Sequence, residues 1–435
     1  MNIQSNEARC TSCHAGYGWK DKDFDFTDQS KVDCLVCNEQ TGTYKKFPAG
    51  AGNPVAEPTI FKGNKKEYLP PDWNKVAQSV ALPSRKNCGT CHFSGGGGDG
   101  VKHGDLDSSL FKPNKHLDVH MGTDGQNFSC TRCHSTKLHH IAGRVYTTPA
   151  SEHRKSLVED DLAHKITCES CHTDKPHQEA AKMNDHTDKV ACQSCHIPTF
   201  ARVNPTKMSW DWSTAGRKKD GKPYKEKDEF GKPSYDTKKG TFVWAKNVEP
   251  TYFWYNGSME HLTVKDTIDP SGVVALNRPL GERNDPNSRI FPFKLHEGRQ
   301  PYDKVNKNMV ILHLFPKGKE DNTAYWKKFD WAQSIEFGMD YAGLAYSGEY
   351  DFVETSYVYP TTHMVAPKED AVACGECHAR ENSRLANLTG FYMPGRDNFA
   401  LLNTIGWLVV LGSLVGVIVH GFVRLVSKSS RNGEE

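Results

Sequence analysis

The stretch Cys34-Leu35-Val36-Cys37-Asn38 matches a haem-attachment motif in every position but the last. In the motif Cys-x-x-Cys-His, the two thiols bond covalently to the porphyrin of a c-type haem and the histidine binds the iron. Asparagine, a poor ligand for iron, stands here in the place of that histidine. An iron held at this motif must take another ligand or keep one face open, so this is the first place to look for chemistry.

The same spacing accounts for every cysteine in the chain. All 14 cysteines fall into seven pairs with two residues between their members, and six pairs are followed directly by histidine. Zinc ribbons use cysteine pairs two at a time, whereas seven is odd. A disulfide framework gives no reason for the six histidines. Besides Cys34 and Cys37, the motifs are Cys10, Cys13 and His14; Cys88, Cys91 and His92; Cys130, Cys133 and His134; Cys168, Cys171 and His172; Cys192, Cys195 and His196; and Cys374, Cys377 and His378.

This pattern predicts a multihaem c-type cytochrome with seven covalently attached haems c. Only 37% of the 435 residues are hydrophobic, so the haems are expected to supply much of the core. The predicted fold is mainly α with extensive irregular loops: short helices at the haem motifs are joined by loops and organised by the covalent haems. The formal charge is +2 before the haem propionates are added, and the lysines carry no signal for binding a nucleic acid.

The C-terminal region predicts one membrane anchor. Residues 404–423 carry no acidic or cationic side chain apart from neutral His420, and a stretch of 20 apolar residues spans a bilayer. Arg424, Lys428 and Arg431 follow, which places the C-terminus in the cytoplasm and the haem-bearing body on the periplasmic face. A buried core helix is the alternative. His420 either binds a haem b of a partner or packs near the bilayer edge.

Haem c is attached outside the cytoplasm, so the chain must be exported. Residues 1–7 have no charged start, apolar run or cleavage site, and we expect a leader to precede them. The predicted regions are 1–200 with six motifs, a cysteine-free scaffold at 201–373, the last motif and a connector at 374–398, the anchor at 399–424 and a cytoplasmic tail at 425–435.

Two local patterns lie between the motifs. Residues 71–81 predict a helix with Asp72 near its start and a proline after its end. Residues 95–100 (Gly-Gly-Gly-Gly-Asp-Gly) predict a tight loop beside a haem. In the cysteine-free region, the repeats Gly221-Lys222-Pro223 and Gly231-Lys232-Pro233 predict turns between short strands. Its aromatic and lysine-rich patches are interpreted as a scaffold over the haems, or as a basic rim that attracts an anion or a partner.

Electron-transfer haems usually carry a second axial ligand, here expected to be histidine. Fourteen histidines lie outside the motifs, and a surface histidine is the ordinary alternative for any one of them. The candidates for the second ligand are His103, His120, His140, His177, His186 and His363.

Three interpretations of Asn38 remain open. Another side chain supplies the one axial bond and leaves the opposite face of the iron open; a distant histidine takes the site; or no haem attaches. A deprotonated lysine is a good donor to iron. The lysines before the next motif are Lys45, Lys46, Lys62, Lys65, Lys66, Lys75 and Lys86. Lys75 is chosen because the predicted helix would hold it rigidly.

Several segments resemble the octahaem tetrathionate reductase family of multihaem cytochromes. The resemblance rests on residues 9–20 (RCTSCHAGYGWK), 32–37 (VDCLVC), 87–93 (NCGTCHF) with 101–106 (VKHGDL), 192–198 (CQSCHIP) and 391–396 (FYMPGR). It covers nearly the whole chain up to the anchor. The family is related in haem arrangement to hydroxylamine oxidoreductase and cytochrome c nitrite reductase.

The resemblance implies one lysine-ligated active-site haem among bis-histidine haems, and reduction of tetrathionate, nitrite or hydroxylamine. Asn38 makes the haem of Cys34 and Cys37 the match for that active site. The family has eight haems and this chain shows seven motifs, so an eighth is expected in a missing N-terminal part. The anchor is a second departure, because it is not expected in every member.

We therefore expect a membrane-anchored, extracytoplasmic oxidoreductase that reduces a small sulfur or nitrogen oxyanion, with Lys75, Asn38 and His103 at its site. Lys65, Lys66, Lys86 and His103 are the candidate proton donors. The expected partners are a quinol-oxidising or cytochrome b-type membrane subunit and the lipid bilayer, and an oligomer is left open. The alternative is a non-catalytic electron carrier between such a subunit and an external acceptor.

Overall fold

The computed structural model describes residues 11, 13–21, 23–61, 65–137, 140–141, 166–316 and 318–431. The chain forms two compact units, Met1–Val372 and Ala373–Glu435, and each is described by itself. Cys10, one of the predicted attachment residues, lies outside the described residues.

In the described part of the chain, short helices form at six motifs, as predicted. Asp33 caps the first of them: its carboxylate accepts a hydrogen bond from the backbone N–H of Leu35, a common way to satisfy the open end of a helix. The motif elements in the described residues are α2 (Cys34–Asn38), α4 (Arg85–His92), the 3₁₀ helix η3 (Cys130–Arg132), α6 (Glu169–His172), α8 (Cys192–His196) and α11 (Cys374–Cys377).

The predicted helix over residues 71–81 is confirmed in a shorter form, α3 (Trp73–Gln78). The side chain of Asp72 accepts a hydrogen bond from the backbone N–H of Lys75 and so fixes the start. A hairpin of β1 (Thr59–Phe61) and β2 (Lys66–Tyr68) precedes it. The other short elements before residue 200 are η1 (Gln29–Lys31), η2 (Ser108–Phe111), β3 (Thr136–Lys137), β4 (His140–Ile141) and α7 (Ala181–Asn184).

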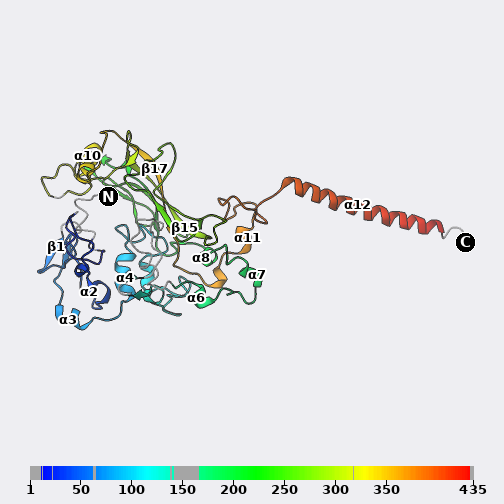
Figure 1. Ribbon diagram of the computed structural model, residues 1–435, viewed down its shortest axis with the longest axis horizontal. Coiled ribbons are helices and arrows are strands. Elements are labelled where there is room, and N and C mark those ends of the chain that lie inside the picture. Colours follow the sequence, from blue (N-terminus) through cyan, green and yellow to red (C-terminus); the bar gives the residue numbers. More distant parts are fainter. Residues whose placement is uncertain are drawn as a thin grey trace. The chain divides into compact units, whose positions relative to one another are not determined.

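The mainly α prediction is not confirmed for the cysteine-free region, which builds a nine-stranded sheet in the order β13-β17-β15-β5-β10-β9-β8, with β11 and β16 also paired to β15. The long strands β15 and β17 pair antiparallel over eleven residues and form the spine seen in Figure 1. The strands of this sheet are β5 (Thr206–Asp211), β8 (Lys225–Lys227), β9 (Pro233–Asp236), β10 (Gly240–Ala245), β11 (Thr251–Tyr255), β13 (Val274–Ala275), β15 (Arg289–Asp303), β16 (Asn308–Met309) and β17 (Tyr350–Pro360).

Both predicted turns are confirmed. Gly221 (φ 72°) joins β6 (Lys218–Lys219) to β7 (Lys222–Pro223) and Gly231 (φ 71°) joins β8 to β9, in a backbone conformation that glycine adopts without strain. The remaining elements are η4 (Trp212–Thr214), β6 (Lys218–Lys219), β7 (Lys222–Pro223), β12 (Met259–His261), β14 (Asn277–Pro279), α9 (Tyr325–Lys328), α10 (Trp331–Tyr341) and η5 (Lys368–Asp370).

The sheet region has its own apolar core and is joined to the motif-bearing region. Phe291 and Phe293 of β15 are buried with Tyr255 and Val358. The carbonyl of Ile290, at the start of the same strand, accepts hydrogen bonds from the hydroxyl of Ser194 in α8 (2.7 Å) and from the backbone N–H of Ala191 (3.0 Å). These contacts support the interpretation of this region as a scaffold.

The second unit carries α11 and one long helix, α12 (Ala400–Arg431). Within residues 400–427 of α12, a window of 18 residues has a mean hydropathy of 2.1 and no buried part, and this is the one helix among the described residues that is long and apolar enough to cross a membrane. The predicted span of 404–423 lies inside it.

Candidate functional site

The motifs of the first unit lie against one another. Thiols of different motifs form hydrogen bonds: Cys13 with Cys91, Cys88 with Cys130, and Cys168 with Cys192. None of the thirteen cysteines in the described part is in a disulfide. In the same residues, no three His, Cys, Asp or Glu side chains gather to hold a metal ion by themselves.

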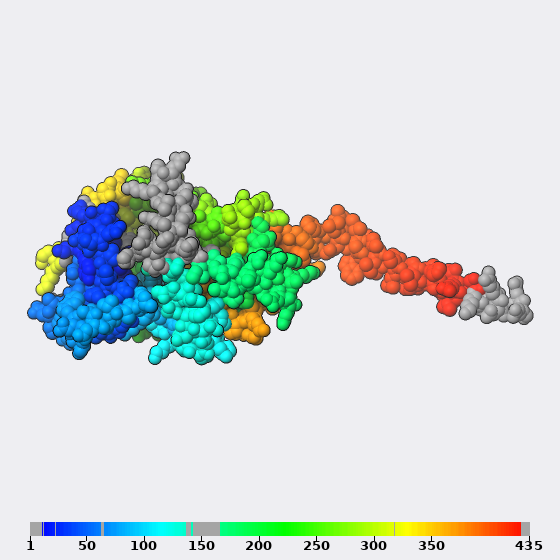
Figure 2. Space-filling view, turned by 60° about the horizontal axis from the view of Figure 1, so that its bottom comes forward, coloured from blue at the N-terminus to red at the C-terminus, as the bar shows by residue number. Residues whose placement is uncertain are grey.

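The altered motif belongs to the same cluster. The side-chain amide of Asn87, in α4, donates to the carbonyl of Glu39 (2.7 Å) just after α2. The hydrogen bond to Cys130 and burial raise the pKa of Cys88, the hydrogen bond to Cys13 and burial raise that of Cys91, and Cys37 lies near enough to add to both shifts. Figure 1 shows α2 and α4, the helices of the second and third motifs, side by side in this unit, and Figure 2 shows the blue and cyan parts of the chain packed against each other.

Three motif histidines each face a second histidine, and the distance between the two ring centres is nearly the same in all three pairs. The ring centres are 6.0 Å apart for His120 and His172, 6.2 Å for His134 and His363, and 6.4 Å for His177 and His196. Two imidazoles on opposite faces of one iron place each nitrogen about 2 Å from the metal, with each ring centre about 1.1 Å further out, so their centres are about 6.2 Å apart. The residues present therefore fit bis-histidine haem.

Each of these second histidines lies opposite a motif other than its nearest neighbour in the chain. His120 precedes the motif of Cys130 but faces the histidine of the next motif, and His177 follows that motif but faces the one after it. His363 lies close before Cys374 in sequence and faces His134. Sequence proximity gave no guide to these partners.

Acceptors on the Nδ1 side orient the rings. Nδ1 of His363 lies 3.2 Å from Oδ2 of the buried Asp105. Nδ1 of His177 lies 3.2 Å from Oδ1 of Asn184, and in the second unit Nδ1 of His378 lies 2.7 Å from the carbonyl oxygen of Pro394. A ring that donates from Nδ1 presents its Nε2 lone pair to a metal.

Asp105 and His363 form a charge-assisted pair. Burial alone would lower the pKa of His363, but its hydrogen bond to Asp105 outweighs burial and raises that pKa. Burial likewise opposes the charge of Asp105, and the bond to His363 still lowers the pKa of the carboxyl to about 2. The carboxylate is therefore a strong acceptor for the ring N–H.

The other candidate histidines have different surroundings. His14 lies edge-on to Trp19 (5.4 Å), and burial lowers the pKa of His92, with His134 and His363 close enough to add to the effect. His186 is exposed just after α7, and His140 lies on β4. Which haem each of these histidines would serve therefore stays a prediction.

His103 is buried between the sheet and the loop after α4, near the cationic side chains of Lys102 and Lys294. Its ring packs edge-on to Tyr359 (5.3 Å), and burial lowers its pKa to about 4, so the imidazole is neutral at pH 7. The ammonium of Lys294 donates to the hydroxyl of Thr206 (2.6 Å) and to the carbonyl of Lys102 (3.0 Å). Burial lowers the pKa of Lys294 and of Lys207 to about 7.

Asn38 forms hydrogen bonds with the segment that follows α3, through its side chain and its backbone. Its side-chain amide donates to the carbonyl of Ala81 (3.0 Å), and the backbone N–H of Ala81 donates back to the carbonyl of Asn38 (2.9 Å). The hydroxyl of Ser79, at the end of α3, accepts a hydrogen bond from the backbone N–H of Gln40 (3.3 Å). These bonds hold α3, which carries Lys75, beside the altered motif.

Of the candidate lysines, Lys75 and Lys46 have clearly different environments. The ammonium of Lys75 lies 3.4 Å from Oδ2 of Asp72, with 76% of its side chain exposed. The ammonium of Lys46 is buried, 3.1 Å from Asp33, and donates to the carbonyl of Gly16 (3.0 Å). Lys46 is held by these partners, whereas Lys75 is oriented by a single carboxylate.

A buried polar network behind α2 was missed from the sequence. The hydroxyl of Tyr44 donates to Asp33 (2.7 Å) and lies 2.8 Å from the hydroxyl of Tyr17. Burial, with Asp33 adding to it, raises the pKa of Tyr44, so the phenol keeps its proton. Asp33 stands directly before Cys34 as a capping-type residue, and this was the one signal that could have drawn attention to it.

The network leads to an open cavity of about 480 Å³, lined by Tyr17, Trp73, Pro70 and residues 53–56. Trp73 begins α3, and its ring lies 6.0 Å from that of Tyr44. The cavity is thus bordered by the helix of Lys75 and by the polar network of the altered motif. The candidate donors Lys65, Lys66, Lys86 and His103 are not among its lining residues.

The chain is similar to three known proteins or families. The sequence model described as bacterial cytochrome c matches residues 207–381. The crystal structure of octahaem cytochrome c from Shewanella oneidensis is similar with a TM-score of 0.74 and 45% identity, covering 88% of this chain and 80% of that chain. An uncharacterized protein of Archaeoglobus fulgidus is 26% identical over 149 residues, 33% of this chain and 49% of that protein. The chain spans about half the length of this curated relative.

Proposed function

The chain belongs to the octahaem tetrathionate reductase family of multihaem c-type cytochromes, and from this premise we propose that it reduces a small oxyanion at the haem of Cys34 and Cys37. As a member of this family it is an extracytoplasmic redox protein with covalently bound haem c. The proposed number of haems in the present chain is seven, one for each motif.

The environment of Asn38 carries the proposal. Its amide is bonded to Ala81, so the residue after Cys37 offers no donor to an iron. At three other motifs, the histidine in the same position faces a second histidine at the spacing of two axial ligands. The second histidines His120, His177 and His363 are therefore proposed as distal ligands, and the altered motif as the haem that differs.

The chain's own residues would perform the rest of the reaction. When bound, the haem supplies electrons and an open coordination position. Lys75, oriented by Asp72, is proposed as the single axial ligand. Tyr17, at the cavity wall, would pass protons into the cavity from the buried Tyr44 and Asp33, because these three groups form one hydrogen-bonded chain. The proposed substrates are tetrathionate, nitrite or hydroxylamine.

Electrons are proposed to enter near Cys374 and Cys377 from a quinol-oxidising or cytochrome b-type membrane subunit. The apolar helix α12 supports the proposal that the chain is anchored in the cytoplasmic membrane, with its C-terminus in the cytoplasm. The sulfur atoms of the first, third and fourth motifs lie close together, as do those of the fifth and sixth, and Cys133 of the fourth motif lies near Cys171 of the fifth. This closeness supports the proposal of a continuous row of haems in the first unit.

The ferric protein should show a high-spin electron paramagnetic resonance (EPR) signal that shifts when nitrite, hydroxylamine or cyanide is added. An open iron face binds such ligands, whereas bis-histidine iron is low-spin and already full. A spectrum in which every haem is low-spin and unmoved by all three ligands would reject the catalytic proposal. The non-catalytic electron carrier would then stand.

The low-spin part of the same spectrum should contain two kinds of signal. The planes of two axial rings both contain the iron–nitrogen axis, so the angle between the rings is the angle between the ligand planes. His177 and His196 are nearly parallel (7°) and should give a rhombic signal, whereas His120 and His172 (68°) should give a highly anisotropic one. Substitution His120→Ala should remove the anisotropic signal alone; loss of a rhombic signal instead would contradict the pairing.

A further inference from the structure

One buried carboxylate joins the two segments that carry His120 and His363. Asp118 is 2% exposed. Its Oδ1 accepts hydrogen bonds from the backbone N–H groups of His120 and Met121, both at 2.9 Å. Its Oδ2 accepts from the backbone N–H of Met364 (2.9 Å) and of Val365 (3.3 Å). The four donors therefore come in two pairs, one pair on each oxygen.

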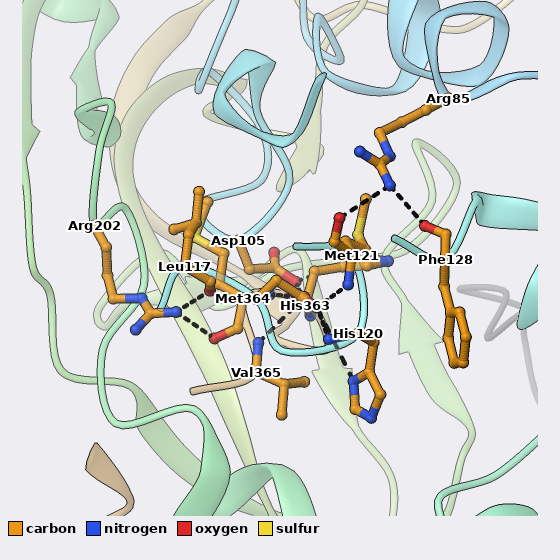
Figure 3. A network of polar contacts seen from close by, with 11 residues as sticks. Arg85, Asp105, Leu117, His120, Met121, Phe128, Arg202, His363, Met364 and Val365 are labelled. Carbon is orange, nitrogen blue, oxygen red and sulfur yellow. Dashed lines mark hydrogen bonds and ion pairs between the residues drawn. The ribbon is translucent and has the colours of Figure 1, made fainter. Parts of the chain in front are cut away.

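Two further contacts join the same segments. The guanidinium of Arg202 donates to the carbonyls of Leu117 and Met364, as Figure 3 shows. The backbone N–H of Val119 donates to the carbonyl of Val365 (2.9 Å). The charge of Arg202 also faces Asp118. The segments 117–121 and 363–365 are thus held together by hydrogen bonds to their backbone groups, with Asp118 between them.

The two joined histidines serve different motifs. His120 faces His172 of the fifth motif, and His363 faces His134 of the fourth. We propose that Asp118 is a positioning residue shared by two haem sites, which fixes the distal ligands of both at once. This inference rests on the distal ligands proposed above and not on the catalytic role of the altered motif.

Asp105 provides a matched comparison. It is also buried (3% exposed), but its Oδ2 receives hydrogen bonds from one segment only: the backbone N–H groups of Thr362 (2.8 Å) and His363 (3.0 Å), and Nδ1 of His363. Figure 3 shows Asp105 beside His363. Loss of Asp105 therefore bears on one haem, whereas loss of Asp118 bears on two.

The experiment counts the haems that bind carbon monoxide in the full-length, haem-loaded protein. Ferrous bis-histidine haem does not bind carbon monoxide, and a haem that has lost its distal ligand does. Above the wild-type level, Asp118→Ala should add two such haems per chain and Asp105→Asn at most one. Asp118→Asn should add at least one, because asparagine keeps one acceptor oxygen but turns an N–H₂ group toward two backbone donors.

Two single-ligand variants separate the possible failures. His120→Ala and His363→Ala should each add one carbon monoxide-binding haem; if neither does, the distal ligand assignment is wrong. If both do, and Asp118→Ala keeps all its haems yet adds none, Asp118 is not a positioning residue. Should Asp118→Ala be recovered with haems missing, Asp118→Asn decides: an added haem supports the inference and an unchanged count overturns it.

Discussion

Substitution Lys75→Leu should remove the high-spin ligation of the altered motif and lower the rate of substrate reduction on the order of 100-fold or more, since even the outer partners of a metal ligand are commonly worth 10- to 100-fold. Lys75 lies on α3, and the hydrogen bonds between Asn38 and Ala81 hold that helix beside α2. Leucine keeps the helix-forming preference and most of the volume but offers no donor atom. The measurement is steady-state nitrite reduction together with the ferric EPR spectrum.

Lys31→Leu is a matched control. The ammonium of Lys31 lies 3.8 Å from Oδ2 of Asp28, three residues earlier, and Asp28 caps η1 as Asp72 caps α3. Both substitutions thus remove the same kind of exposed ion pair, which contributes at most about 1 kcal/mol. The control should keep its activity and spectrum. If the high-spin signal of Lys75→Leu is also unchanged, Lys75 is not the ligand.

The local parts of this structure were readable from the sequence, because covalent attachment and capping act over a few residues. The motifs predicted the short helices, and Asp72, predicted to lie near the start of a helix, is the residue directly before α3. The glycines at 221 and 231 marked two turns. In each of these cases the evidence is contained in a short stretch of chain.

The sheet was missed because its central strand does not look like one. β15 contains Pro292 and Pro301, which are unusual inside a sheet, and it buries Lys294 (1% exposed) and Asp303. The alternation of apolar and polar residues that marks a strand is therefore broken. The partners of these buried charges, such as Thr206 for Lys294, come from distant segments and leave no local signal.

The same limit applies to the candidate site. Cys34, Cys37 and Asn38 could be recognised from spacing alone, but the histidines opposite the motifs come from other parts of the chain. The residues that orient them, Asp105 and Asp118, show no pattern of their own in the sequence. Their roles follow from backbone and ring contacts between segments more than 200 residues apart.

Substitution Asp33→Asn should destabilise the protein by about 3–5 kcal/mol, because it leaves the ammonium of Lys46 buried without its counter-charge. The side chain of Asp33 is fully buried and that of Lys46 is 5% exposed. Asparagine is a good capping residue, so the start of α2 should survive. Thermal or denaturant unfolding of the haem-loaded variant measures the change.

The double substitution Asp33→Asn with Lys46→Met separates stability from proton delivery. Removing both members of a buried ion pair is often nearly neutral, so most of the lost stability should return. Activity should not return, because Tyr44 no longer faces a carboxylate that can take up and release a proton. The expected loss in turnover is about 10²- to 10⁴-fold, the usual contribution of a positioned acid or base.

The outcome decides what the network of Tyr17, Tyr44 and Asp33 is for. If the double variant regains both stability and turnover, the network is structural and protons reach the cavity by another route. If it regains stability alone, a group at the end of the network supplies protons to the substrate, since the proposed ligand Lys75 is untouched and an unchanged high-spin signal would show that Lys46 is not the ligand. If the loss of turnover becomes smaller as the pH is lowered, protons from bulk water replace the missing carboxyl, because the rate then depends on proton concentration and not on Asp33.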